Sequence, residues 1–160
     1  MKTVISLILA VFTCTAAYAQ MPKVVLNDIH GNSVAVDTIG THGQPVIVDF
    51  FATWCKPCLR ELGAIAEVYP DWQEETGMRL VAISIDQAQN INKVKPLADE
   101  NSWEWDVLLD PNSDVARAFN VKMIPSTLIV DGKGNIIYRH TGYADGAEEE
   151  LIEKIREIKK

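Results

Sequence analysis

A short apolar segment followed directly by a helical pattern restricts the possible folds more than any other feature of this sequence. Residues 46–51 (VIVDFF) form a nearly continuous apolar run, which is typical of a fully buried β-strand. From Lys56 onward, apolar residues such as Leu62 and Ile65 recur at helical spacing. We expect Pro70 to kink or end this helix, because proline lacks a backbone N–H. A buried strand that leads into an amphipathic helix is typical of an α/β fold.

The remaining sequence alternates between strand and helix patterns. The turn residues 30–32 (HGN) separate two apolar segments and predict an N-terminal hairpin. Further strands are expected at 80–85, 105–109, 127–130 and 136–139, and further helices at 91–100 and 110–119. A final helix is expected with Asp145 as its N-cap and a buried stripe made of Leu151, Ile152, Ile155 and Ile158. Residues 20–160 therefore predict one α/β domain with a central mixed sheet flanked by helices.

The composition excludes several classes of protein. The chain has 160 residues, 48% of them hydrophobic, which allows one domain to bury a core without disulfide staples. Asp and Glu number 22 against 15 Lys and Arg, and the resulting charge of −7 argues against a general nucleic-acid-binding protein. The three cysteines cannot all pair within one molecule, so one of them must have a separate role.

The first nineteen residues have the organisation of a secretory signal peptide. Lys2 gives a basic start, residues 4–12 are apolar, and small residues precede a cleavage site after Ala19. The apolar run is shorter than the roughly 20 residues that span a bilayer. We therefore expect residues 1–19 to be removed and the mature domain to be periplasmic or secreted. A lipid anchor on Cys14 is the alternative, although the residues before it fit a lipobox poorly.

Two cysteines, Cys55 and Cys58, stand where the buried strand ends and the helix begins. Their spacing of three places them on one helix face, close enough to form a small disulfide ring. Cys55 falls at the helix N-terminus, where free N–H groups and the charge of Lys56 favour its thiolate. Pro57 fits the first helical turn. Cys58 lies one turn further in, and we expect it to be the more buried thiol.

Three alternative roles for this cysteine pair fit less well. A structural disulfide that closes a four-residue loop adds little stability. A zinc site needs further cysteine or histidine ligands, and His30, His42 and His140 are scattered along the chain. Inert buried thiols do not suit a position beside Lys56 at a helix start. The pattern therefore favours a redox-active pair that needs neither a metal nor a cofactor.

Residues 48–58 (VDFFATWCKPC) resemble the active-site strand and loop of the thioredoxin superfamily. Residues 123–127 (MIPST) are similar to the loop of that family whose cis-proline lies against the active-site sulfurs. The resemblance implies a thioredoxin fold and a cis bond between Ile124 and Pro125, whereas a trans proline that opens an edge strand is the default without it.

The N-terminal hairpin and the extra helix and strand between residues 86 and 110 resemble a narrower group, the exported thiol–disulfide oxidoreductases of the TlpA/ResA type. Glu61 also matches the pattern of this group. Two positions depart from these relatives. Gly63 stands where the group commonly has a helix-kinking proline, and Ala82 stands where cytoplasmic thioredoxins have a buried lysine.

Asp49 is the second expected catalytic residue. A carboxylate within an apolar strand is costly to bury, and burial raises its pKa. Asp49 matches the thioredoxin aspartate beneath the second cysteine, which implies a proton acceptor for Cys58. A carboxylate that reaches solvent or a backbone N–H is the alternative. Glu61 could tune the same thiol, but we expect it to be an exposed helix carboxylate. The implied substrate-binding residues are Trp54, Lys56, Pro57 and Ile124, and Pro125 completes the catalytic set.

The resemblance implies an exported enzyme that reduces protein disulfides through a mixed disulfide on Cys55. Pro57 and Ile124 are similar to reducing members, whereas Lys56 favours a higher potential, so a disulfide oxidase or isomerase is the alternative. Family analogy implies protein thiols and disulfides as substrates, apocytochrome c among the possibilities. It also implies a monomer and a membrane electron donor of the DsbD or CcdA type.

Functions of other classes fit less well. A thiol peroxidase of the peroxiredoxin type needs a proline and a threonine before its cysteine, where this chain has Val48 and Ala52. A copper carrier would need a wider cysteine spacing and a nearby histidine. A domain with no catalytic role is the remaining alternative.

Overall fold

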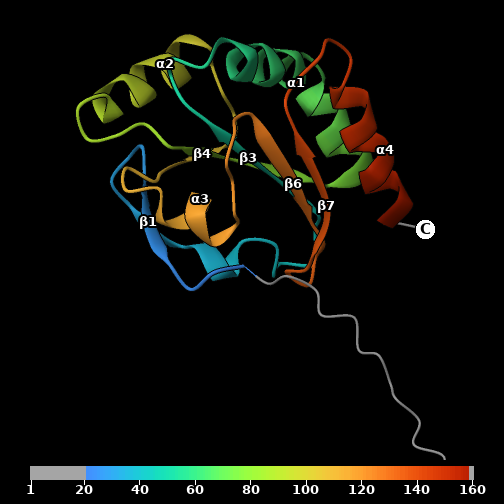
Figure 1. Ribbon diagram of the computed structural model, residues 1–160. Coiled ribbons are helices and arrows are strands. Elements are labelled where there is room, and N and C mark those ends of the chain that lie inside the picture. The colour runs from blue at the N-terminus through green and yellow to red at the C-terminus, as the bar shows by residue number, and fades with distance from the viewer. Residues whose placement is uncertain (1–20, 159–160) are drawn as a thin grey trace, which may run out of the picture.

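The computed structural model describes residues 21–158, which form one seven-stranded sheet with helices on both faces (Figure 1). The strands are β1 (Val25–Asp28), β2 (Ser33–Ala35), β3 (Val46–Phe51), β4 (Arg79–Ser84), β5 (Asp106–Leu109), β6 (Ser126–Val130) and β7 (Ile136–Thr141). The helices are α1 (Lys56–Thr76), α2 (Val94–Glu100), α3 (Asp114–Ala118) and α4 (Glu148–Ile158), with single 3-10 turns η1 (Val36–Thr38) and η2 (Ile91–Lys93).

The sheet is mixed, as the sequence predicts, and its strand order is β2-β1-β5-β4-β3-β6-β7. Strands β3, β4 and β5 run parallel to one another, whereas β6 pairs antiparallel with β3 and β7 pairs antiparallel with β6. The predicted hairpin β1–β2 adds to the free edge of β5. The inserted α2 and β5 supply that edge, so the thioredoxin-like fold with both expected additions is confirmed.

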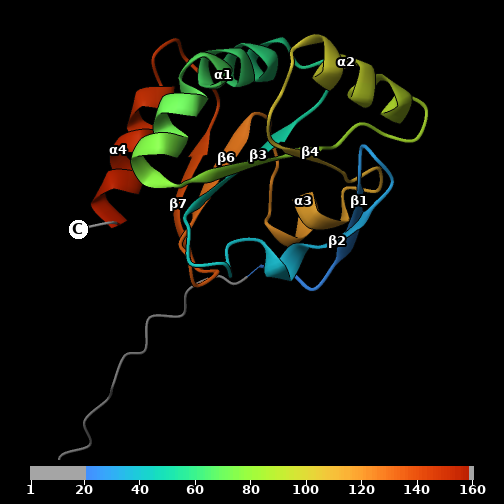
Figure 2. The same cartoon turned by 180° about the vertical axis from the view of Figure 1, so that it is seen from behind.

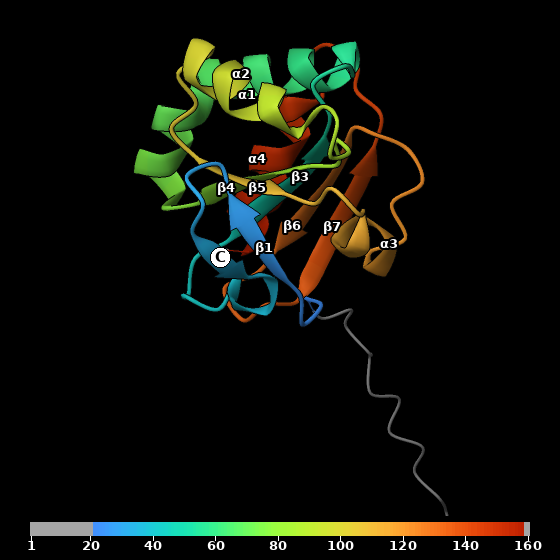
Figure 3. The same cartoon turned by 90° about the vertical axis from the view of Figure 1, so that its left-hand side faces the viewer.

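Strand β3 lies near the middle of the sheet, and all six of its residues are buried. Its side chains alternate between two cores, because successive residues of a strand point to opposite faces. Ile47 and Phe51 pack under α1, α2 and α4, whereas Val48 and Phe50 pack with α3 and η1 on the other face. Figures 2 and 3 show α1, α2 and α4 on one side of the sheet and α3 on the other. Asp49 has the same parity as Ile47 and Phe51, so its carboxyl group lies on the α1 face.

Of the two expected effects of Pro70, a kink in the helix or its end, the second is wrong, because helix α1 continues through Pro70 to Thr76. Proline removes one backbone hydrogen bond from a helix. On either side of it, Tyr69 and Trp72 are buried in the core, and this packing holds the last turns in place.

The expected N-cap of the last helix is also wrong. Helix α4 begins at Glu148, and Gly146 has a φ of 88°, which lies outside the helical region. Asp145 instead forms an ion pair with Arg60 of α1, with a distance of 3.4 Å between the charged atoms.

Within residues 21–158, none of the helices is long and apolar enough to cross a membrane. The predicted signal peptide, residues 1–19 with Cys14, lies outside the described range.

Candidate active site

Cys55 and Cys58 form a disulfide at the start of α1, with their Cα atoms 5.3 Å apart. Cys55 is the N-cap of the helix, and the backbone N–H of Cys58 donates to its Sγ at 3.3 Å. Such a donor at a helix N-terminus stabilises a thiolate on Cys55 once the disulfide is opened. Cys55 is 5% exposed and Cys58 is fully buried, so the two sulfurs differ in access as expected.

A buried carboxylate that we did not identify from the sequence, Asp86, fixes the loop before Cys55. Its oxygens accept hydrogen bonds from the Thr53 N–H at 2.7 Å, from Thr53 Oγ1 at 2.8 Å and from Ser84 Oγ at 2.9 Å. Strands β3 and β4 are parallel, so their carboxyl ends meet at one edge of the sheet, and polar residues after both strands could have pointed to this contact. Asp86 is therefore a positioning residue for the cysteine loop.

The bond between Ile124 and Pro125 is cis, as the resemblance implies. Ile124, the residue before this proline, lines an open hollow together with Trp54, the residue before Cys55. The hollow is lined by Trp54, Ile85, Val121, Lys122, Met123 and Ile124. Trp54 and Met123 are 63% and 64% exposed, which leaves an apolar surface free for contact. Of the predicted substrate-binding residues, the structure brings Trp54 and Ile124 together here, whereas Lys56 and Pro57 do not line the hollow.

Between strand β3 and helix α1, two carboxyl groups meet at one hydroxyl. Thr127 Oγ1 lies 2.9 Å from Asp49 Oδ2 and 2.9 Å from Glu61 Oε1. Asp49 and Thr127 are direct partners across β3 and β6, and Glu61 reaches them from α1. Glu61 is only 2% exposed, so the expectation of an exposed carboxylate is wrong. Its position three residues after Cys58, on the buried face of α1, is the sequence signal that could have shown this.

Burial governs the electrostatics of these two acids. It raises the pKa of Asp49 well above the ordinary value, and the nearby charge of Glu61 raises it further. Burial also raises the pKa of Glu61 to about 7, and the charge of Glu148 adds to that effect. The hydrogen bond from Thr127 acts in the opposite direction on both acids. Ala82 pairs with Asp49 across β4 and offers no cation to offset either charge.

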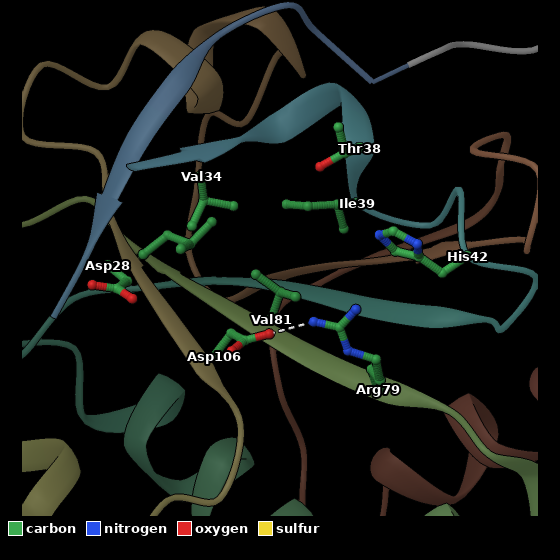
Figure 4. Close-up of a pocket in the computed structure, with 9 residues that line it drawn as sticks. Asp28, Val34, Thr38, Ile39, His42, Arg79, Val81 and Asp106 are labelled. Atoms are coloured by element: carbon green, nitrogen blue, oxygen red, sulfur yellow. Dashed lines mark hydrogen bonds and ion pairs between the residues drawn. The ribbon is translucent and has the colours of Figure 1, made fainter. Parts of the chain in front are cut away.

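A separate hollow has a volume of about 190 Å³. Strands β4 and β5 form one side of it, and the segment from the β1–β2 hairpin to His42 forms the other (Figure 4). Its charged groups already have partners. Arg79 pairs with Asp106, and the Asp28 carboxylate accepts hydrogen bonds from Asn32. No residue of the cysteine loop or of the cis-proline loop lines this hollow, so it does not belong to the redox site.

Comparisons with known proteins agree with this geometry. Residues 18–139 match the AhpC/TSA family. The thiol-disulfide oxidoreductase ResA of Halalkalibacterium halodurans is 25% identical over 139 residues, which cover 87% of this chain and 74% of the relative.

Two solved structures extend the comparison. A thioredoxin-like protein from Porphyromonas gingivalis is 59% identical with a TM-score of 0.78, and the match covers 89% of this chain and 94% of that one. The second structure is a putative thiol:disulfide interchange protein DsbE from Chlorobium tepidum, which is 23% identical with a TM-score of 0.77. The match covers 88% of this chain and 96% of that one, and it supports the fold alone. The chain therefore belongs to the AhpC/TSA family, has a thioredoxin-like fold with a Cys55–Cys58 disulfide, and is similar over most of its length to a thiol–disulfide oxidoreductase.

Proposed function

We propose that this protein reduces disulfide bonds in other proteins, with Cys55 as the nucleophile and Cys58 as the resolving thiol. The observation that carries the proposal is the asymmetry of the pair. The sulfur of Cys55 receives a backbone N–H at the start of α1 and is partly accessible, whereas Cys58 is fully buried. A protein substrate can therefore reach Cys55 first, and the mixed disulfide forms there.

The reaction then follows from thiol–disulfide exchange. In the reduced protein, the Cys55 thiolate attacks one sulfur of the substrate disulfide, and the other substrate sulfur leaves as a thiolate. Cys58 gives its proton to Asp49, and the electron pair left on sulfur attacks Cys55 Sγ. The bond between Cys55 and the substrate breaks, the second substrate thiolate leaves, and the internal disulfide is restored. Two electrons have then passed to the substrate.

The hollow beside the cysteines is the proposed substrate surface. Trp54 and Met123 expose apolar side chains on it, and Ile124 connects it to the cis-proline loop. Methionine adapts its shape to different partners, which suits an enzyme that takes several protein substrates. Lys122 adds a positive charge at its border.

The proposal also includes the place of action and the electron supply. Residues 1–19 would direct export, and the domain 20–160 would act outside the cytosol as a monomer. A reductase there needs a source of electrons, and a membrane thiol carrier of the DsbD or CcdA type would meet that need.

Insulin reduction tests the proposal. Wild-type protein with dithiothreitol should speed the precipitation of insulin chains, and Cys55→Ser should return the rate to that of dithiothreitol alone. Cys58→Ser should accumulate a mixed disulfide that a reductant releases. Glu67→Gln, an exposed change on the same helix, is the control that keeps the wild-type rate. A Cys55→Ser protein as active as wild type would refute the assignment.

A further inference from the structure

At the junction where Asp49, Glu61 and Thr127 meet, there are too few hydrogen-bond donors for both acids to be ionised. A threonine hydroxyl has one hydrogen and two acceptor lone pairs. Both carboxyl oxygens lie 2.9 Å from Thr127 Oγ1, which is hydrogen-bond distance on each side. The hydroxyl can donate to only one of them. The second contact is a hydrogen bond only if that acid is protonated and donates to the hydroxyl.

The other two oxygens of the acids point to the same conclusion. Asp49 Oδ1 and Glu61 Oε2 are buried and have no hydrogen-bond partner among residues 21–158. A buried carboxylate with an unpartnered oxygen is strongly disfavoured, whereas a protonated acid requires fewer partners. Within the same range, neither acid belongs to an ion pair.

The groups around the junction do not supply the missing positive charge. From β4 the facing residue is Ala82, and from α4 the nearest charge is the carboxylate of Glu148. On β7, His140 is the direct partner of Thr127 and points to the same face of the sheet, but among residues 21–158 it forms no ion pair with either acid. On α1, Cys58 lies one turn before Glu61 and is held in the disulfide.

We propose that Asp49, Thr127 and Glu61 act as one proton-holding unit, in which the two acids share a single proton in the oxidised protein and accept a second when Cys58 loses its own. The shared proton stands on the oxidised structure, whereas the second step rests on the proposed function. In that step the S–H bond of Cys58 breaks, an O–H bond forms on the unit, and the electron pair stays on sulfur. The unit then changes from one negative charge to none, so Glu61 and Thr127 assist the same transfer as Asp49.

Carbon-13 NMR of the carboxyl groups in the oxidised protein tests the shared proton without any substrate. In the wild type, the two acids should lose their protons in separate steps, and each resonance should sense both steps. Glu61→Gln should lower the titration midpoint of Asp49 by about one pH unit or more, and Asp49→Asn should do the same for Glu61. Thr127→Val should raise both midpoints, and Thr127→Ser should restore them.

The outcomes separate this inference from the proposed function. Glu67→Gln, which removes a charge from the exposed side of α1, should leave both midpoints unchanged. The shared proton is refuted if each acid keeps its wild-type titration midpoint when the other is replaced. That means the same midpoint for Asp49 in Glu61→Gln, and the same midpoint for Glu61 in Asp49→Asn. Insulin reduction measured on the same samples reports on the proposed function. Coupled midpoints in a protein that reduces no insulin would overturn the second step and leave the shared proton in place.

Discussion

Replacing Glu61 by Gln should make the stability of the folded protein less sensitive to rising pH. In the folded state, burial raises the pKa of Glu61 from 4.5 to about 7. Between these values the folded protein retains a proton that the unfolded chain has lost. The free energy of unfolding therefore falls as pH rises through this range, because the folded state binds more protons.

The size of this effect follows from the shift. Each pH unit of difference between the folded and unfolded pKa corresponds to about 1.4 kcal/mol, so Glu61 removes about 3 kcal/mol of stability between pH 4.5 and pH 8. That is a large part of the roughly 5–15 kcal/mol that holds a typical domain together. Gln carries no titrating proton, so the variant keeps this stability, and the pKa of Asp49 falls in the same variant because a neighbouring charge is gone.

Denaturant unfolding at pH 5, 6, 7 and 8, with the disulfide intact and tryptophan fluorescence as the signal, measures the difference. The free energy of unfolding of Glu61→Gln relative to wild type should rise by about 2.5 kcal/mol from pH 5 to pH 8. Glu67→Gln, on the exposed side of α1, should follow the wild-type curve. Parallel pH curves for wild type and Glu61→Gln would refute the assignment of a raised pKa to the buried acid.

Three further substitutions test the positioning of the loop and the packing of the backbone. Asp86→Ala leaves the N–H and hydroxyl of Thr53 without their acceptor, so the free energy of unfolding should fall by about 2–4 kcal/mol. A change below about 0.5 kcal/mol in denaturant unfolding would contradict the role of Asp86. Gly132→Ala would place a Cβ atom 2.5 Å from the carbonyl carbon of Gly43, so this variant should have a lower melting temperature than wild type. At Gly63 an added Cβ atom meets nothing within 4 Å, so Gly63→Ala should stabilise α1 by up to about 1 kcal/mol. Equal melting temperatures for the two alanine variants would contradict this difference.

The parts of the site that the sequence predicts are those set by local pattern. Residues 46–51 are apolar with Asp49 as the single interruption, so a buried strand could be predicted, and Cys55 and Cys58 are placed by the helix that follows. The cis bond before Pro125 is predicted only by family resemblance, since the sequence pattern alone favours a trans proline.

The parts that the sequence does not predict depend on contacts between distant segments. Carboxylates are rarely buried without a partner, so an exposed Glu61 was the natural expectation. Its partner Thr127 lies 66 residues later, and only the register of β3 against β6 brings that hydroxyl to Asp49 and Glu61. Asp86 reaches Thr53 across 33 residues because β3 and β4 pair in parallel.

The reduction potential of the Cys55–Cys58 pair is the sharpest test of the proposed reducing role. The oxidised fraction of the protein, measured after equilibration in a series of glutathione or thioredoxin buffers, gives this value. A protein-disulfide reductase should have a potential near that of thioredoxin, about −270 mV. A potential near about −120 mV, typical of a strong disulfide oxidant, would contradict a reducing role.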